Sequence, residues 1–155
     1  MIRHLLLLLF TLFTLAGPAA AADASGTFPR STLEIATADG RKLAFSIELA
    51  QDSAQRGLGL MFRQKLAADA GMLFDFQTDQ DVAMWMKNTF IPLDMLFVRA
   101  DGTIHRITER TVPQSLEAIW SQGKVRAVLE LNGGTVSRLS IRPGDKLIHP
   151  VFARN

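Results

Sequence analysis

Apolar side chains recur at every second position through most of this chain, and that period constrains the fold more than any other feature of the sequence. The clearest run is LAFSIEL at 43–49, where large apolar residues alternate with small or polar ones. Side chains of a β-strand point alternately to opposite faces, so the run predicts a strand with one buried face. Asp39-Gly40 separates it from a similar run at 33–37, which predicts a β-hairpin.

The same alternation, broken by turn signals, predicts a mainly β domain. Further strands are expected at 71–76, 82–87, 93–98, 104–107, 125–131 and 146–151. One short helix is expected near residues 53–66, because apolar residues there follow helical spacing after two candidate N-caps, Asp52 and Ser53. Thr135 offers a cap for one further helical turn through Leu139. Many short strands at close spacing are typical of a sandwich or a barrel-like sheet in a compact single domain.

The N-terminus has the pattern of a secretory signal peptide. A short basic start precedes an unbroken apolar run at 5–16 and small residues at 17–22. The apolar run is shorter than the roughly 20 residues that a membrane-spanning helix requires. We therefore expect residues 1–22 to be removed on export, with cleavage after Ala24 as the alternative.

What remains is a nearly neutral chain without cysteine. We expect a flexible leader at 23–29 and a single domain at 30–155, which is periplasmic or secreted and has no membrane span. The chain has 17 Lys and Arg residues against 15 Asp and Glu residues, and Arg3 falls in the signal peptide. This balance gives no case for a nucleic-acid partner, which would require a basic stripe. Without disulfides the fold depends on its apolar core, and about 130 residues are enough to build one.

Residues 84–94, MWMKNTFIPLD, hold the densest mixture of unlike chemistry in the chain. Proline restricts its own backbone and that of the residue before it, so we expect a strand, a sharp corner and a second strand here. The corner brings the indole of Trp85, as a stacking floor, together with the polar side chains of Lys87, Asn88, Thr89 and Asp94. An aromatic face beside convergent hydrogen-bonding groups suits a sugar or a small polar metabolite.

A purely structural corner is the competing interpretation. In that case Asn88 and Thr89 satisfy backbone groups of the loop, and Asp94 pairs with Lys87 or Arg63. Short polar side chains at turns usually bond to the backbone, so the residue types alone do not separate the two interpretations.

Two arginines and a glutamate extend the candidate site. Guanidinium groups bind carboxylates and phosphates, so Arg56 and Arg63 could hold an anionic ligand. They could instead pair with Asp94 and Glu130 and fasten the predicted helix to the sheet, which is the interpretation we favour. Glu130 lies away from the apolar face of its strand, where it is either buried with a partner or, more simply, solvated. The candidate ligand-binding residues are therefore Trp85, Lys87, Asn88, Thr89, Asp94, Arg56, Arg63 and Glu130.

Several motifs follow one another along most of the mature chain. They are Arg56, GLMFR at 59–63, Leu66, GMLF at 71–74, WMKNT at 85–89, IPLD at 91–94, Phe97, DGTI at 101–104, VLEL at 128–131 and GD at 144–145. These motifs resemble those of the family called domain of unknown function 192, although Ala83-Met84 stands where many members carry an aromatic residue. The resemblance implies a compact β-rich domain, often exported, and it implies no activity.

Enzyme signatures are weak in this sequence. There is no cysteine nucleophile, no Gly-x-Ser-x-Gly elbow and no phosphate-binding loop. We therefore expect a binding or accessory module whose partner is a small polar ligand or a component of the cell envelope. A hydrolase acting on envelope glycans through Asp94 and Glu130 is one alternative, because two carboxylates can cleave a glycosidic bond.

Copper binding through methionine is the second alternative. Thioethers suit Cu(I), and the candidates are Met61, Met72, Met84, Met86 and Met95. Core filling by these adaptable side chains is the interpretation we favour. The scattered His105 and His149 lack metal-ligand spacing, so we expect no metal or other cofactor.

Overall fold

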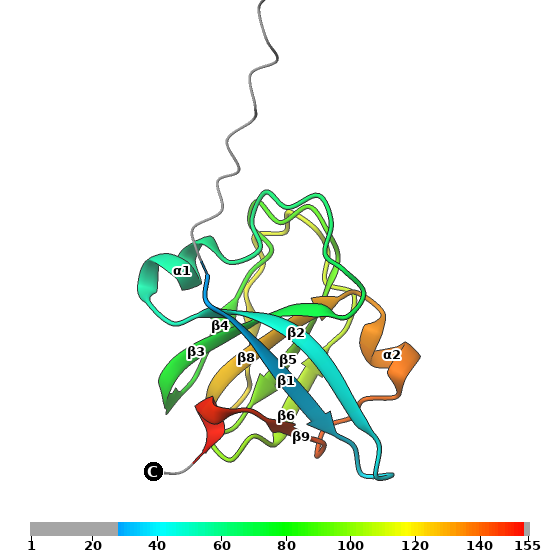
Figure 1. The fold of residues 1–155 in the computed structure, drawn as a ribbon. Coiled ribbons are helices and arrows are strands. Elements are labelled where there is room, and N and C mark those ends of the chain that lie inside the picture. Colours follow the sequence, from blue (N-terminus) through cyan, green and yellow to red (C-terminus); the bar gives the residue numbers. More distant parts are fainter. Residues whose placement is uncertain (1–27, 154–155) are drawn as a thin grey trace, which may run out of the picture.

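The computed structural model describes residues 28–153, which fold into a strongly curled β-sheet with short helices at its margins (Figure 1). The predicted signal peptide at 1–22 lies outside the described residues. The strands are β1 (Arg30–Ala36), β2 (Lys42–Ala50), β3 (Ala70–Gln80), β4 (Ala83–Met84), β5 (Leu93–Val98), β6 (Ile104–Thr108), β7 (Ile119–Trp120), β8 (Val125–Asn132) and β9 (Lys146–Ile148). The helical segments are α1 (Ser53–Leu58), α2 (Thr135–Leu139) and the 3₁₀ turn η1 (Pro150–Phe152).

Seven strands form one sheet in the order β6-β5-β8-β3-β2-β1-β9, and β4 pairs with β7 in a separate two-stranded sheet. Only β2 and β3 run parallel among the described strands. The two edges of the large sheet approach each other: the N–H of Leu147 donates to the carbonyl of Gly102 at 2.8 Å, and the N–H of Ile104 donates to the carbonyl of Asp145 at 2.8 Å. This contact between the edges confirms the prediction of a mainly β, barrel-like sheet.

The curled sheet separates two apolar cores. One takes side chains from all seven strands, among them Leu33 and Leu129, and fills the inside of the curl. The other covers the outer face of β3, β5 and β8, where Met72 and Phe97 pack against Met86 from the segment after β4. Every residue of β5 is buried, as expected of a central strand with packing on both faces. Each large apolar side chain buried in this way contributes about 1.5–3 kcal/mol, which supports a fold without disulfides.

The helix α1 is shorter than the predicted helix near 53–66. It begins with a capping box, in which the Asp52 carboxylate accepts a hydrogen bond from the N–H of Gln55 at 2.7 Å and the Gln55 side chain bonds back to the N–H of Asp52. It ends at Leu58 because Gly59 has a φ of +48°, outside the helical region. A Cβ at Gly59 would lie 3.0 Å from the ring of Phe74, so the chain there lies directly on the sheet.

The predicted strand at 82–87 is also shorter than expected, since only Ala83–Met84 pairs, with β7. The predicted alternation persists nevertheless: Val82 and Met86 are buried, whereas Trp85 is exposed. The segment leaves the large sheet to cover its outer face, and this explains why both of its sides carry bulky residues. Within residues 28–153 no helix is long and apolar enough to cross a bilayer.

Candidate functional site

A cavity of about 220 Å³ opens over the outer face of the large sheet. Its walls come from α1, the loop after α1, the segment around β4, and strands β3 and β8. Side chains that line it include those of Met61, Phe74, Phe76, Met84, Trp85 and Glu130. We call this cavity the Glu130 pocket, because Glu130 is its only acidic lining residue among the residues that the structure describes.

Glu130 projects from the middle of β8 into this pocket. Its neighbours across the sheet are Met72 on β3 and Met95 on β5, both fully buried. The residue is only 4% exposed, and among residues 28–153 no hydrogen-bonding or charged partner acts on its carboxyl group. Burial raises the pKa of the Glu130 carboxyl from its ordinary value of 4.5 to about 8. At neutral pH the side chain therefore holds its proton for most of the time. The solvated glutamate expected from the sequence is wrong, and so is a buried glutamate with a protein partner.

Arg56 stands at the rim of the Glu130 pocket. Its Nη1 donates to the carbonyl of Gln51 at 2.5 Å and to that of Asp75 at 3.0 Å. The guanidinium also lies 5.4 Å from the centre of the Phe76 ring, a cation–π distance. Arg56 therefore fastens α1 to the sheet, as favoured from the sequence, but through backbone carbonyls instead of Asp94 or Glu130.

Trp85 forms one wall of the pocket and is 49% exposed. The Nζ of Lys87 lies 5.0 Å from the centre of the indole, so the ammonium sits over Trp85. Thr89 is buried and lines the pocket, and its hydroxyl donates to the carbonyl of Lys87 at 3.2 Å. The segment thus supplies an aromatic wall with a cation outside it.

Asn88 makes the sharp corner that the sequence predicts. Its φ of +54° lies in the left-handed region, which asparagine tolerates better than most residues. Its carbonyl accepts a hydrogen bond from the N–H of Phe62 at 2.8 Å, and its amide nitrogen lies 3.9 Å from the sulfur of Met61. Asn88 therefore ties the corner to the loop after α1 and does not line the pocket.

The carboxylate of Asp94 bonds to backbone N–H groups away from the Glu130 pocket. Its carboxylate accepts hydrogen bonds from the N–H groups of Arg110 at 2.8 Å, Gly134 at 2.9 Å and Val136 at 2.8 Å. The predicted pairing with Lys87 or Arg63 is therefore wrong. Asp94 is fully buried and holds the start of α2.

Arg63 is held by a different carboxylate from those predicted. Its guanidinium makes a two-pronged ion pair with Glu48 on β2, with N–O distances of 2.5 Å and 3.2 Å. It also lies 5.7 Å from the centre of the Phe28 ring. The ion pair joins the loop after α1 to β2, so Arg63 has a structural partner, but it lies outside the helix and does not pair with Asp94 or Glu130 as predicted.

The methionines divide into two groups. Met72, Met86 and Met95 are fully buried in the outer core, and the sulfur of Met86 accepts a hydrogen bond from the Thr111 hydroxyl at 3.1 Å. Their placement favours the interpretation as core filling. Two other methionine side chains, at positions 61 and 84, line the Glu130 pocket instead. Within the described residues no group of three or more His, Asp or Glu side chains could hold a metal ion.

The structure brings together four of the eight candidate residues, Arg56, Trp85, Thr89 and Glu130, around one cavity. Lys87 and Asn88 lie beside it, and Arg63 and Asp94 serve other parts of the fold. Phe74 and Phe76 line the pocket but were not among the predicted site residues, and the thioethers of Met61 and Met84 were considered only as copper ligands or core filling. The signal for part of that lining was the alternation at 71–76, which places Phe74 and Phe76 on one face of β3.

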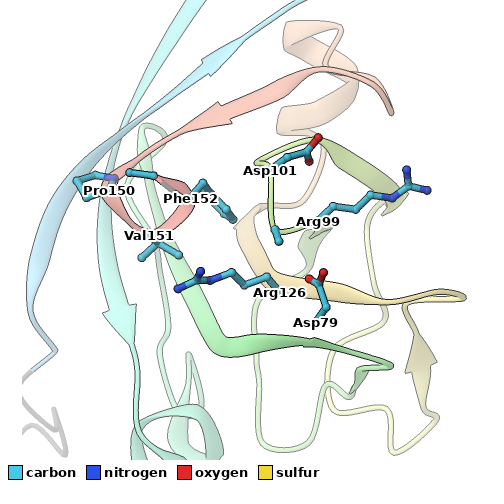
Figure 2. Close-up of a pocket in the computed structure, with 9 residues that line it drawn as sticks. Asp79, Arg99, Asp101, Arg126, Pro150, Val151 and Phe152 are labelled. Carbon is cyan, nitrogen blue, oxygen red and sulfur yellow. The ribbon is translucent and has the colours of Figure 1, made fainter. Parts of the chain in front are cut away.

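A second cavity, of about 680 Å³, lies beside η1 (Figure 2). Arg126 and Arg99 contribute to it, but both are already engaged: Nε of Arg126 lies 3.3 Å from the Asp75 carboxylate and Nη2 of Arg99 lies 2.9 Å from Nδ1 of His105. Figure 2 shows the guanidinium of Arg99 directed away from Phe152. The cations of this cavity therefore have partners, in contrast to the acid of the Glu130 pocket.

The family model of DUF192, described as an uncharacterized ACR, matches residues 34–149. The chain belongs to this family, which confirms the resemblance seen in the sequence.

Two crystal structures are similar to the chain. One, from Sinorhizobium meliloti 1021 and described as a "putative transcription regulator", is 49% identical with a TM-score of 0.79, and the match covers 80% of this chain and 96% of that one. The other, from Novosphingobium aromaticivorans DSM 12444 and described as a protein of unknown function, is 36% identical with a TM-score of 0.77, covering 90% and 99%. No curated protein matches the chain.

Proposed function

We propose that this protein is an exported binding module that holds a small organic ligand in the Glu130 pocket. One observation carries the proposal: an acidic side chain only 4% exposed, engaged by no described protein group, lines a cavity whose lining includes three aromatic and two thioether side chains. Ligand sites commonly combine an apolar cavity with a few placed polar groups.

The energetics of Glu130 support a role in binding. Burying a polar group without a hydrogen-bonding partner destabilises a fold, and an apolar side chain between Met72 and Met95 would avoid that cost. A strongly shifted acid in a cleft is also a recognised mark of functional sites. A ligand that supplies the missing partner would recover the cost on binding.

The walls of the pocket suit an organic body. Trp85 presents a half-exposed indole to the pocket, and the ring of Phe76 lies 5.4 Å from the guanidinium of Arg56. Aromatic faces stack on flat or aliphatic groups with little loss of side-chain freedom. Met61 and Met84 add flexible surface that adapts to ligands of different shape.

Export is the part of the proposal that rests on the N-terminal sequence. The basic start, apolar run and small residues at 1–22 support it. Expression of the full chain, followed by fractionation and mass determination of the mature protein, tests it. A mass that begins near Asp23 in the periplasmic or secreted fraction is expected, and an unprocessed chain in the cytoplasm would contradict it.

The binding test uses the two tryptophans as a matched pair. Trp85 lines the pocket, whereas Trp120 lies on β7, is 56% exposed and does not line it. A fragment library should be screened by thermal shift and the hits measured by titration with the wild type, Trp85→Ala and Trp120→Ala. We expect hits to weaken at least tenfold in Trp85→Ala and to bind Trp120→Ala as they bind the wild type. Hits that bind both variants equally well would exclude the pocket.

A further inference from the structure

We propose that the ligand of the Glu130 pocket is a small organic ammonium ion, with its nitrogen against the Glu130 carboxylate and its carbon body between Trp85 and Phe76. The inference rests on the proposed function, because it assigns a chemical class to the ligand of the same pocket. It follows from the neighbours of Glu130, from the engagement of nearby charges and from the chemistry of the walls.

The sheet leaves the Glu130 carboxyl without a partner on either side. Residues directly opposite each other on adjacent strands form a row, and here that row runs through Arg30, Glu48, Met72, Glu130, Met95 and Thr108, so the two direct neighbours of Glu130 are methionines. The thioethers on both sides of Glu130 have no N–H or O–H group to donate. A donor for the carboxylate must therefore come from the pocket side, where the ligand would sit.

The charged groups of the surrounding elements already have other partners. Arg56 on α1 bonds to two backbone carbonyls, Arg63 in the next loop is paired with Glu48, and Lys87 lies over Trp85. The nearby acids do not compete, because Asp94 projects from the opposite face of the sheet and Asp75 pairs with Arg126. In the part of the chain that the structure describes, no cation reaches Glu130, so the position beside it is open to a ligand.

The pocket walls favour a cation over an anion. Aromatic rings attract ammonium groups through their electron-rich faces, and thioether sulfurs are weak acceptors. Phe74, Phe76 and Trp85 supply the rings, and Met61 and Met84 supply the sulfurs. Arg56 and Lys87 already lie over Phe76 and Trp85, which shows that these rings attract cations. An anionic ligand would instead be repelled by the oxygens of the Glu130 carboxyl group and by the electron-rich faces of the same rings. The lining therefore matches an ammonium ion with a short apolar body.

Binding of such an ion is coupled to the release of a proton. The carboxyl is protonated below a pKa of about 8, whereas an ammonium ion pairs with the carboxylate. Below that pH each ammonium ion that binds displaces one proton from Glu130 to solvent, and the ammonium group keeps its own protons. The affinity should then rise about tenfold for each pH unit and level off near the pKa. A neutral ligand that accepts the proton of Glu130 in a hydrogen bond would show the opposite trend.

The test compares probes with the same carbon body and different polar groups, charged or neutral. Methylammonium, butylammonium and benzylammonium ions should be titrated calorimetrically beside methanol, butanol and benzyl alcohol, with benzoate as the anion, from about pH 6 to about pH 8. Repeating each titration in buffers of different ionisation enthalpy counts the protons released. We expect at least one ammonium ion to bind more than tenfold tighter than its alcohol at the higher pH, with the release of close to one proton at the lower pH.

Variants separate the inference from the proposed function. Glu130→Gln keeps the shape of the side chain without its charge and should lose at least tenfold in ammonium affinity, together with the proton release. Glu117→Gln, the same change at an exposed position, should bind like the wild type. Alcohols that bind as tightly as ammonium ions, or ammonium ions that do not bind at all, would overturn the inference. Fragments that still bind through Trp85 in that case would leave the proposed function standing.

Discussion

Asp94 and Glu130 lie on adjacent, hydrogen-bonded strands, but their side chains project from opposite faces of the sheet. Asp94 stands opposite Leu131, and Glu130 stands opposite Met95, one step further along β5. The sheet therefore lies between the two carboxyl groups. This geometry contradicts the glycan-hydrolase alternative, because a pair of carboxylates must flank one glycosidic bond to cleave it. The two acids also differ in chemistry, since Asp94 receives three backbone N–H groups and Glu130 receives none among the described residues.

The stability of the ligand-free protein should fall as the pH rises, because of Glu130. Its pKa is raised from 4.5 to about 8 in the folded protein, so the folded state binds more protons than the unfolded state between those values. The free energy of unfolding should decrease over this range by up to about 1.4 kcal/mol for each pH unit.

The measurement is urea denaturation at about pH 5 and about pH 8 with the wild type and Glu130→Gln. We expect the wild type to lose a few kcal/mol relative to the variant, which cannot ionise at position 130, and the variant to be the more stable protein at the higher pH. Parallel pH profiles for the two proteins would show that the carboxyl titrates normally and is solvated.

Asp94→Ala should destabilise the fold strongly. The substitution leaves three backbone N–H groups without their acceptor, that of Val136 at α2 in a buried place and those of Arg110 and Gly134 in part-buried ones. An unsatisfied buried polar group costs about 1–3 kcal/mol, so a total of at least about 3 kcal/mol is expected from chemical denaturation. Asp79→Ala, at an exposed position, is the control and should change stability by less than about 0.5 kcal/mol. A small effect at Asp94 would mean that water replaces the carboxylate.

Gly59→Ala and Gly57→Ala should have opposite effects. Gly59 has a φ of +48°, and a Cβ there would lie 3.0 Å from the Phe74 ring, so alanine should cost about 1–3 kcal/mol. Gly57 lies within α1, and a Cβ added there would meet no atom within 4 Å, so alanine should stabilise by about 0.5–1 kcal/mol. Thermal unfolding of both variants tests this. Equal shifts in midpoint would contradict the assignment of Gly59 as the residue that ends the helix.

The ion pair between Arg63 and Glu48 should be coupled by about 1 kcal/mol in a double-mutant cycle. Because of its two-pronged geometry and partial burial, we expect its coupling free energy to exceed that of the usual exposed ion pair. The cycle uses Arg63→Ala, Glu48→Ala and the double variant, with unfolding free energies as the readout. The coupling should shrink in high salt, and a coupling near zero would mean that the loop after α1 is held by other contacts.

Local patterns were enough to predict most strands of this fold, although β7 was not predicted and β9 ends before the expected residue 151. The alternation at 43–49 and the Asp39-Gly40 turn predict both strands of the β1–β2 hairpin to within a few residues of their observed ends. Where the pattern was ambiguous, at 82–87, tertiary packing decided: the segment covers the outer core and pairs at only two positions. The helix predicted near 53–66 is shorter in the structure because the backbone of Gly59 lies against Phe74. That contact joins segments that are distant in sequence, so local patterns do not predict it.

The candidate site was predictable only in part, for a related reason. Trp85 and Thr89 were found because unlike chemistry concentrates in one short stretch of the sequence. The burial and protonation of Glu130 depend on its neighbours on β3 and β5 and on the segments that cover the outer face of the sheet. Neither follows from the sequence of β8. The partners of Arg63 and Asp94 lie on other elements, Glu48 on β2 and the backbone at α2, and were missed for the same reason.

The contact between Gly102 and Leu147, which joins the two margins of the curled sheet, has a bearing on solubility. Unpaired strand margins are templates on which other chains add and aggregate. Here the edge strands β6 and β9 are short and meet near their ends. Few unpaired backbone N–H and C=O groups therefore remain on which a neighbouring molecule could add a strand. A chain that has no covalent cross-links would thereby resist amyloid-like assembly even where it is concentrated.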